Sequence, residues 1–432
     1  MQLSQAVSAV LLFLAVAFAG TGTVVAGSDV AADLKHVVAA ACSEQEQGTA
    51  AIAERLGGGV LVDESKTTFR ATTRRVRRTF RLSSGDETRL TTLRRDGVLF
   101  RFFVELYRPA SGPITRPEMM AVADGRCRIV HGRRITYDGK GRADHLIFLS
   151  PALDDTGFRE PLNPPVPAGD DPGGVTIALI DSGVSYRLPM FAGRLARDGA
   201  GQVLGYDYWD MDDRPYDVDT SRSPFFPGHH GTRVASVLVR EAPGIRLIPY
   251  RYPRPDMSRM RDLVADADAK GAKVVAVPMG SNKSGDWEAF ADAARARPHM
   301  LFVISAGNNG RNIDERPVYP AALRLDNAIV VTSGHRDGRL ARGSNWGPRS
   351  VDLMVPAEDL EAIDHRGAST RASGSSYAVP RVTALAARLL DQNPNWAGPE
   401  LKRAIIARAQ PLPADGDQIV LYGWIRDLQI DD

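Results

Sequence analysis

The sequence is poor in cysteine and lacks the ligand spacing of a zinc-binding motif. Cys42 and Cys127 are its two cysteines, and no set of cysteines and histidines recurs at zinc-ligand intervals. We therefore predict no metal ligands. The two cysteines are able to pair in an oxidising compartment, but the sequence leaves open whether their Cα atoms come close enough. Internal repeats and low-complexity tracts are absent as well, and 432 residues suffice for two folded domains.

Charged side chains are missing from the first 27 residues. An apolar stretch over residues 6–20 and small-residue sites at 17–19 and 24–26 are typical of a secretory signal peptide. The usual lysine or arginine near the start is lacking, and an uncleaved membrane anchor is the less favoured alternative. We predict a signal peptide over residues 1–26 and a secreted or periplasmic protein, which is membrane-anchored only if this segment is retained.

The net charge of +2 is unevenly distributed along the chain. Residues 28–150 hold 21 Lys and Arg against 15 Asp and Glu, whereas residues 151–432 hold 33 against 37. This asymmetry indicates two units with different surfaces. The arginines of the first unit are interleaved with strand-like residues rather than clustered, so we expect no nucleic-acid partner.

The first unit is predicted to be a small α+β domain over residues 27–150. Apolar side chains in residues 29–56 recur at helical intervals with a polar break, and from residue 60 to 149 they alternate with polar ones. Turn residues at 83–86, 96–97 and 138–141 separate the alternating runs. We expect a helical segment followed by an antiparallel meander of roughly five or six strands. Residues 151–173, rich in proline and glycine, are predicted to be a linker.

The second unit, residues 174–432, is predicted to be a doubly wound α/β domain with a mostly parallel sheet. Its continuous apolar runs are typical of strands buried on both faces. They occupy residues 175–180, 246–250, 274–277, 301–304 and 328–331, and helical patterns occupy 231–240, 258–270, 287–297 and 376–391. In such sheets, sites lie beyond the carboxyl ends of the strands.

Four polar residues stand where predicted elements begin or end. Asp181 closes the first buried run, His230 opens one helix, Ser376 opens another, and Asn308 follows a strand after Ala306-Gly307. Acyl transfer by a serine needs a base, a carboxylate that holds the base, and donors for the oxyanion, and these four residue types supply them. Pro380 is expected in the opening turn of the Ser376 helix, where a missing N–H costs little.

Four short motifs resemble the signature blocks of the subtilisin-like serine peptidases, the subtilases. They occur in the order Asp, His, Ser of that family, over about residues 172–426. The motifs are Asp181-Ser182-Gly183-Val184, His230-Gly231-Thr232-x-Val234-Ala235-Ser236, Ala306-Gly307-Asn308 and Gly374-Ser375-Ser376-Tyr377-Ala378-x-Pro380-x-Val382. An α/β-hydrolase nucleophile elbow is excluded, because its histidine follows the serine and the last histidine here, His365, precedes Ser376.

The resemblance implies a role for each matched residue. Ser376 would be the nucleophile, His230 the general base and then acid, and Asp181 the carboxylate that orients the imidazole. Asn308 and the Ser376 backbone N–H would bind the oxyanion. The implied substrate-binding residues are Pro278, Met279, Gly280, Ser281, Ser305, Ala306 and Gly307. Pro278 departs from the serine usual in the family, and His229 is expected to be a neighbour of the site rather than the base.

We therefore expect a secreted serine endopeptidase that acts on protein or peptide substrates and requires no cofactor. Subtilases often bind calcium, and acidic residues crowd the loop before His230, although a solvated acidic loop is favoured: Asp207, Asp210, Asp212, Asp213, Asp217 and Asp219. The alternative function is a non-catalytic, subtilase-like module that binds peptides.

The front unit has two possible roles. A pro-region that assists folding and blocks the cleft would be removed by cleavage, which we predict within residues 151–173. A retained accessory domain is the other role, because the unit is larger than a usual compact pro-region.

Overall fold

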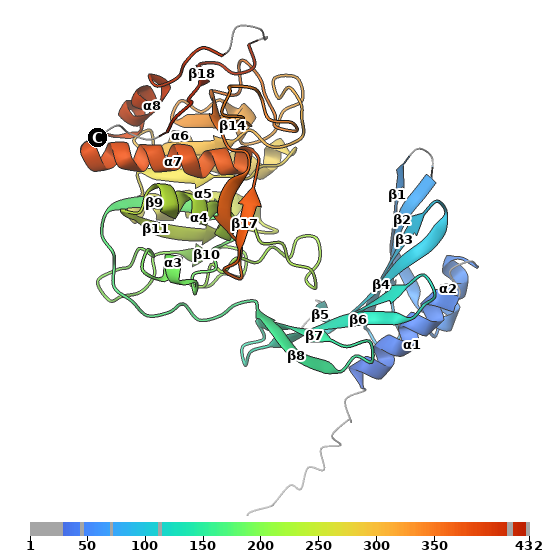
Figure 1. Ribbon diagram of the computed structural model, residues 1–432. Helices are drawn as coiled ribbons and strands as arrows, with labels where there is room; N and C mark the ends of the chain where they lie inside the picture. The colour runs from blue at the N-terminus through green and yellow to red at the C-terminus, as the bar shows by residue number, and fades with distance from the viewer. Residues whose placement is uncertain (1–28, 44–46, 70–71, 111–114, 413–417, 429–432) are drawn as a thin grey trace, which may run out of the picture.

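The chain folds into two units that the predicted boundary separates approximately (Figure 1). The computed structural model describes residues 29–43, 47–69, 72–110, 115–412 and 418–428. The predicted signal peptide, residues 1–26, lies outside these residues. None of the helices in the described ranges has both the length and the apolar character that a membrane span needs.

The N-terminal unit consists of two helices packed on one face of an eight-stranded antiparallel meander. The meander therefore has more strands than the sequence predicted, because several charged or threonine-rich segments also pair as strands. The elements are α1 (Val30–Ser43), α2 (Thr49–Arg55), β1 (Val60–Phe69), β2 (Thr72–Arg81), β3 (Glu87–Arg95), β4 (Val98–Pro109), β5 (Thr115–Asp124), β6 (Ile129–Tyr137), β7 (Ala143–Leu149) and β8 (Asp155–Pro161). Strand β8 occupies part of the predicted linker, where prolines and a glycine weaken the alternating pattern.

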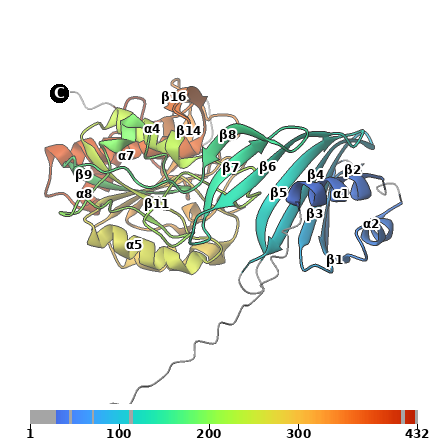
Figure 2. The same cartoon turned by 90° about the horizontal axis from the view of Figure 1, so that it is seen from below.

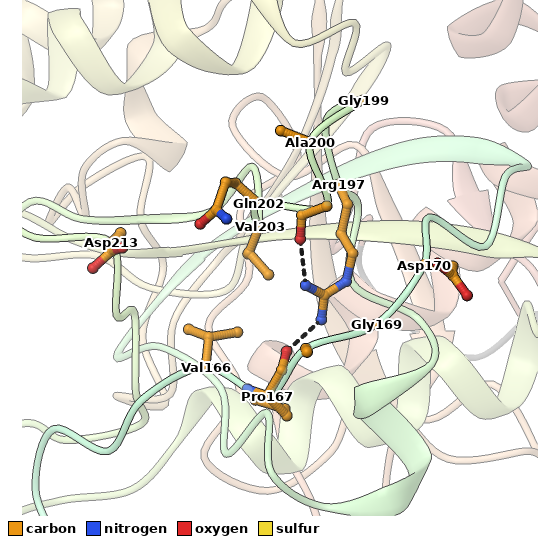
Figure 3. Close-up of a pocket in the computed structure, with 12 residues that line it drawn as sticks. Val166, Pro167, Gly169, Asp170, Arg197, Gly199, Ala200, Gln202, Val203 and Asp213 are labelled. Atoms are coloured by element: carbon orange, nitrogen blue, oxygen red, sulfur yellow. Dashed lines mark hydrogen bonds between the residues drawn. The ribbon is translucent and has the colours of Figure 1, made fainter.

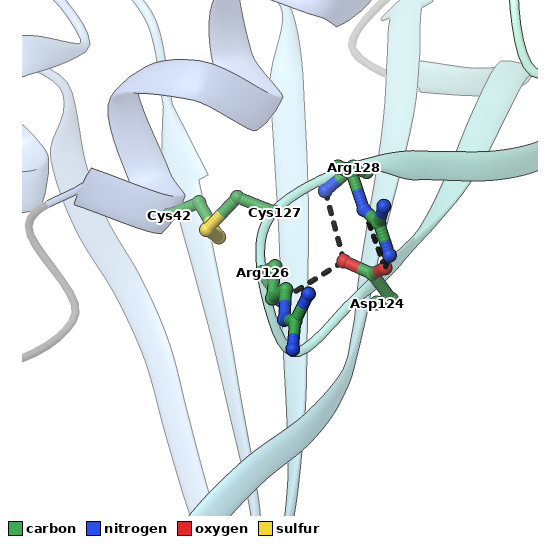
Figure 4. The surroundings of a disulfide bond; sticks show 5 residues. All are labelled: Cys42, Asp124, Arg126, Cys127 and Arg128. Carbon is green, nitrogen blue, oxygen red and sulfur yellow. Dashed lines mark hydrogen bonds and ion pairs between the residues drawn. A yellow bond between two sulfur atoms is a disulfide. The ribbon is translucent and has the colours of Figure 1, made fainter.

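A disulfide between Cys42 and Cys127 joins the end of α1 to the turn between β5 and β6 (Figure 4). The two Cα atoms are 5.9 Å apart, so the pairing that the sequence left open is formed in this structure. Asp124 stabilises the same turn, because its carboxylate accepts from the backbone N–H groups of Arg126 and Arg128. The crosslink holds α1 against the core that Leu34, Phe80 and Phe102 help to form.

The C-terminal unit has a parallel sheet in the order β10-β11-β9-β12-β13-β14-β15-β18, which confirms the predicted doubly wound class. Its elements are β9 (Val175–Asp181), α3 (Pro189–Ala192), β10 (Tyr206–Asp207), α4 (Gly231–Glu241), β11 (Ile245–Arg251), η1 (Met257–Arg259), α5 (Met260–Ala269), β12 (Val274–Val277), η2 (Ser284–Trp287), α6 (Glu288–Arg295), β13 (Leu301–Ser305), η3 (Ala321–Leu323), β14 (Ala328–Gly334), β15 (Leu353–Pro356), β16 (Leu360–Ile363), β17 (Ser369–Ala372), α7 (Ser375–Gln392), α8 (Gly398–Ile406) and β18 (Gly423–Trp424).

Successive residues of the parallel strands enter two different cores. Ile177 and Leu179 pack with α4 and α7 on one face, whereas Ala178 and Ile180 pack with α5 and α6 on the other. This is why the strands read as continuous apolar runs. Strand β9 pairs with β11 on one side and with β12 on the other, so the chain reverses its direction of winding at β9. Ligand sites of open α/β sheets lie at such a switch point, beyond the carboxyl end.

The N-terminal unit packs against the loop of residues 212–229, which leads into α4. On its β8 side the antiparallel sheet lies next to the C-terminal unit, and β1 lies at the far end (Figure 2). Arg133 donates to the carbonyl of Phe225 at 2.6 Å and lies over the Phe226 ring, 4.2 Å from its centroid. Arg142 pairs with Asp212 at 3.0 Å. The loop therefore receives both polar and aromatic contacts from the other unit.

The remainder of the predicted linker is folded onto the C-terminal unit. The buried Arg197 donates to the carbonyls of Pro167 and Gly201, each at 2.8 Å, beside a cavity of about 820 Å³ (Figure 3). The carboxylate of Asp171 accepts from the Arg197 backbone N–H and pairs with Arg246 at 2.9 Å. Residues 167–171 are thus fixed by buried and half-buried arginines.

Candidate active site

The predicted carboxylate and base meet at the switch point of the parallel sheet. Asp181 is the last residue of β9, and His230 immediately precedes α4. His230 Nδ1 lies 2.9 Å from Asp181 Oδ1 and 2.8 Å from Oδ2. Because a carboxylate only accepts, Nδ1 must carry the proton, and Nε2 of the neutral ring has a free lone pair. This is the tautomer that a general base requires.

The close approach of α4 to the end of β9 requires a glycine after His230. A Cβ at Gly231 would lie 2.0 Å from the carbonyl oxygen of Gly183 and 3.1 Å from Cβ of Asp181. Backbone atoms would have to move to accommodate it. The glycine thereby allows His230 and Asp181 to lie within hydrogen-bonding distance.

The pKa of His230 lies above its ordinary value of 6.5. Burial disfavours the imidazolium and would lower this pKa, but the Asp181 carboxylate outweighs it by charge and by hydrogen bonding. The charge of Asp217 raises the pKa further. About a third of the His230 side chain, 36%, is exposed, whereas that of Asp181 is buried.

Asp217 is a site residue that sequence reasoning missed, since it appeared only as one member of the acidic loop. It is fully buried, and its Oδ1 accepts from the Ser182 hydroxyl at 2.6 Å and from the His230 N–H at 3.1 Å. Its Oδ2 accepts from the Thr232 N–H at 2.9 Å. The carboxylate thus stabilises the start of α4 as a capping residue would. In the sequence, only its apolar neighbours Tyr216 and Val218 could have indicated that Asp217 is buried.

Ser376 is the second residue of α7 and is half-buried. Its hydroxyl donates to the carbonyl of Pro278 at 3.0 Å, and among the described residues no hydrogen bond joins it to His230. The neighbouring Tyr377 ring lies 6.1 Å from the His230 ring, so the start of α7 is close to the base.

The expectation for Pro380 was partly wrong. The helix starts close to Ser376 as predicted, but it begins at Ser375, so Pro380 lies inside it rather than in its opening turn. A proline at this position has no N–H to donate to the carbonyl of Ser376, four residues earlier. The run of buried residues on both sides stabilises the helix despite this loss, since Ala378, Val379 and Val382 are fully buried.

Asn308 lies against the start of the same helix. Its Oδ1 accepts from the backbone N–H of Ser375 at 2.9 Å and from the Ser375 hydroxyl at 3.0 Å. A Cβ at Gly374, whose φ is +119°, would lie 2.9 Å from this oxygen, so glycine is required there. With Oδ1 occupied, the Nδ2 amide remains as a donor next to the first-turn N–H of Ser376. Binding of an oxyanion by these two donors stays a prediction.

The family model described as Subtilase family matches residues 173–424, which is more than half of the chain. The chain belongs to the subtilase family. The match covers the C-terminal unit with all four predicted catalytic residues, and it leaves the N-terminal unit outside.

Curated relatives are similar over the same part of this subtilase. The thermophilic serine proteinase of Bacillus sp. (strain AK1) is 28% identical over 257 residues, 56% of this chain and 58% of the relative. The alkaline serine exoprotease A of Vibrio alginolyticus is 29% identical over 262 residues, 58% of this chain and 44% of the relative. The chain thus spans about half the length of these curated relatives.

Solved structures are also similar to part of this chain. A cold adapted subtilisin-like serine proteinase aligns with a TM-score of 0.49 and 24% identity, over 62% of this chain and 93% of that chain. A lanthipeptide protease aligns with a TM-score of 0.48 and 22% identity, over 59% of this chain and 87% of that chain.

The predicted substrate-binding residues lie at the ends of β12 and β13. Met279, Gly280, Ser281 and Gly307 are partly or fully exposed, whereas Pro278, Ser305 and Ala306 are buried. Ser281 forms an antiparallel bridge with Tyr319 through two backbone hydrogen bonds of 2.8 Å. The Ser305 hydroxyl lies 2.8 Å from that of Ser375, so a hydrogen bond joins the end of β13 to the start of α7. Substrate binding by this set stays a prediction.

The acidic loop before His230 is extensively paired within the protein. Asp207 and Asp210 pair with the buried Arg251, at 2.8 and 2.5 Å. Asp212 pairs with Arg142, and Asp219 accepts from Tyr252 at 3.3 Å. Calcium binding by this loop stays a prediction. A separate cluster of Glu160, His229 and His365 has the donor types of a transition-metal site.

We predict that Asp217→Ala strongly destabilises the protein. The change removes the acceptor of the Thr232 N–H and one of the two acceptors of both the Ser182 hydroxyl and the His230 N–H, at a cost of about 3 kcal/mol. The measurement is the free energy of unfolding in urea, in a Ser376→Ala background that prevents self-digestion. Asp213→Ala is the matched control: its side chain is 74% exposed, and a change within about 0.5 kcal/mol is expected. Equal losses for the two variants would contradict the role of Asp217.

Proposed function

We propose that this subtilase is a secreted serine endopeptidase, which hydrolyses peptide bonds through Ser376, His230 and Asp181 and a covalent acyl-enzyme. The observation that carries the proposal is the pairing of His230 Nδ1 with Asp181, because it leaves Nε2 free as a base beside the start of α7. The relatives named as serine proteinases support the reaction class.

The reaction begins when the Ser376 hydroxyl turns from the Pro278 carbonyl to His230 Nε2. Nε2 takes the hydroxyl proton as Oγ forms a bond to the carbonyl carbon of the scissile peptide. The imidazolium then gives this proton to the leaving amine, and the C–N bond breaks. A water molecule then gives a proton to Nε2 and bonds to the acyl carbon. The bond between this carbon and Ser376 Oγ breaks, and the imidazolium returns the proton to Oγ. Asp181 stabilises the imidazolium in both halves without taking its proton.

The negative charge that develops on the substrate oxygen requires fixed donors. The Asn308 Nδ2 amide and the Ser376 N–H are suited to this role, since both lie at the positive end of α7. The Ser375 N–H donates a hydrogen bond to Asn308 Oδ1 and thereby fixes the orientation of the Asn308 amide. The donors are therefore oriented before the substrate arrives.

For the N-terminal unit, the contacts favour a retained domain over a pro-region that blocks the cleft. Its hydrogen bonds and ion pairs to the other unit, among the described residues, run to Asp212, Ser223–His229 and residues 365–366. None of them involves residues 278–281 or 305–308. Arg197 and Arg246 also hold residues 167–171 in place. The predicted cleavage within 151–173 is untested, and export through the predicted signal peptide is part of this proposal.

A fluorophosphonate is expected to label the folded protein at Ser376, because only an activated serine attacks it rapidly. Ser376→Ala should abolish the label and the hydrolysis of a casein substrate, and His230→Ala should reduce both. Mass spectrometry of the labelled species also gives its N-terminus, which is expected before residue 50 if the front unit is retained. A folded protein that binds peptides but takes no label would be a non-catalytic binding module instead.

The activity is expected to fall on the acid side with an apparent pKa above 6.5, because His230 acts as a base only when neutral. A raised pKa keeps the imidazole protonated to higher pH, so kcat/KM should rise with pH through this value. It should fall about tenfold per pH unit below it. The measurement is kcat/KM for a chromogenic peptide between pH 5 and 9. An acid limb centred below pH 6 would contradict the assigned Asp181–His230 pairing.

Replacing Asn308 is expected to lower kcat rather than raise KM. Asn308→Ala removes a donor to the oxyanion and should reduce kcat by about 10²–10³-fold. Asn308→Asp is the decisive comparison, because it keeps an oxygen for the Ser375 N–H but removes the Nδ2 donor. Its kcat should fall at least as far, whereas Asn309→Ala, at the exposed neighbouring position, should keep kcat within about 2-fold. Recovery of activity in Asn308→Asp would show that Asn308 acts only through Ser375.

A further inference from the structure

Glu160, His229 and His365 meet at the junction of the two units. Glu160 lies in β8, the last strand of the N-terminal sheet. His229 directly precedes His230, and His365 lies in the turn between β16 and β17. One ligand atom from each residue lies within 4.8 Å of the other two. The three side chains are largely buried, with exposures of 9%, 11% and 17%.

The donor atoms of this cluster are close together but poorly hydrogen-bonded. Glu160 Oε1 is 2.9 Å from His229 Nε2 and 3.1 Å from His365 Nε2. Nevertheless, among the described residues, neither Oε1 nor His365 Nε2 has a hydrogen-bond partner in acceptable geometry. Both atoms are buried, where an unpaired polar atom destabilises the protein. These separations are slightly shorter than the roughly 3.3 Å between neighbouring ligands of a tetrahedral zinc ion, so a small shift of the side chains would accommodate one.

The protonation of His229 points the same way. Its Nδ1 is 2.5 Å from the backbone carbonyl of Asp217, which only accepts, so Nδ1 carries the proton. Nε2 faces the carboxylate oxygen of Glu160, so a cation, either a second proton on the ring or a metal ion, must lie between the two atoms. A histidine that donates through one nitrogen to a carbonyl is typical of metal ligands.

We propose that Glu160 Oε1, His229 Nε2 and His365 Nε2 bind one divalent transition-metal ion, of which Zn²⁺ fits the donor set. Two imidazoles and a carboxylate are an established zinc ligand set. Arg366 lies 3.3 Å from Glu160 Oε2, so Oε1 is the oxygen that remains for the ion. The His229 and His365 rings are stacked at 3.6 Å and 11°, so one ring must tilt for both in-plane Nε2 lone pairs to meet at one ion.

The ion would connect the two units beside the catalytic base. Glu160 belongs to the N-terminal sheet, whereas the histidines belong to the subtilase domain, and His229 is covalently joined to His230. Metal binding therefore stabilises the docked arrangement of the units.

The proposal is tested by titrating ZnCl₂ into the full-length Ser376→Ala protein, freed of metal by chelator, in an isothermal calorimeter. We expect about one bound equivalent, and at least a ~10-fold loss of affinity in Glu160→Gln and in His365→Asn. His299→Asn is the matched control, because His299 also pairs with a carboxylate, Asp268, at 2.8 Å but lies on the surface. This variant should bind as the parent does. Circular dichroism of the metal-free proteins checks that each variant is folded.

X-ray absorption of the zinc-loaded parent gives a second readout that needs no substitution. Two imidazole nitrogens and one carboxylate oxygen are expected at about 2.0–2.2 Å from the zinc. The proposal is overturned if the parent takes up no stoichiometric zinc, or if the double variant Glu160→Gln/His365→Asn binds as tightly as the parent. A zinc shell without two imidazoles overturns it as well. In each of these cases a proton on His229, rather than a metal, bridges to Glu160.

Discussion

The arrangement of the active site depends on one buried carboxylate, that of Asp217. It accepts from Ser182 after β9 and from the N–H groups of His230 and Thr232 at the start of α4. A buried charge is stable only when hydrogen bonds replace its hydration, and these three donors do so. Because Asp217 binds both elements, it fixes the distance between Asp181 and His230. The Asp181–His230 pair is therefore positioned by a third buried residue.

The same loop is the docking site of the N-terminal unit. Arg133 of the antiparallel sheet donates to the Phe225 carbonyl and lies over the Phe226 ring. His229 lies within 2.9 Å of the Glu160 carboxylate of β8. The segment of residues 217–230 thus ends at His230, and several of its other residues contact the N-terminal unit. A change in how the units dock would reach His230 through its covalent neighbour His229. This physical continuity makes the front unit part of the environment of the site, even though the family match begins at residue 173.

The sequence predicted the parts that rest on local patterns. The buried runs of β9, β11, β12 and β13, and the helices that follow them, are recognisable because parallel strands are apolar on both faces. The sequence also indicated Asp181, His230, Asn308 and Ser376, because each closes or opens such an element. It underestimated the meander, since β1 is almost entirely exposed and therefore lacks an apolar face.

Contacts between distant residues could not be predicted in this way. Asp217 looked like its acidic neighbours, because only its burial distinguishes it. Glu160, His229 and His365 are separated by 69 and 136 residues, so no ligand interval is visible in the chain. Rigidity in the site is likewise distributed: Ser305 supports Ser375, Ser375 orients Asn308, and Asp181 orients His230. The hydroxyl of Ser376 is bound to a single carbonyl, and breaking such a bond costs only about 1 kcal/mol. Turning this hydroxyl away from Pro278 therefore costs little compared with breaking the several hydrogen bonds that hold Asp181, His230 and Asn308.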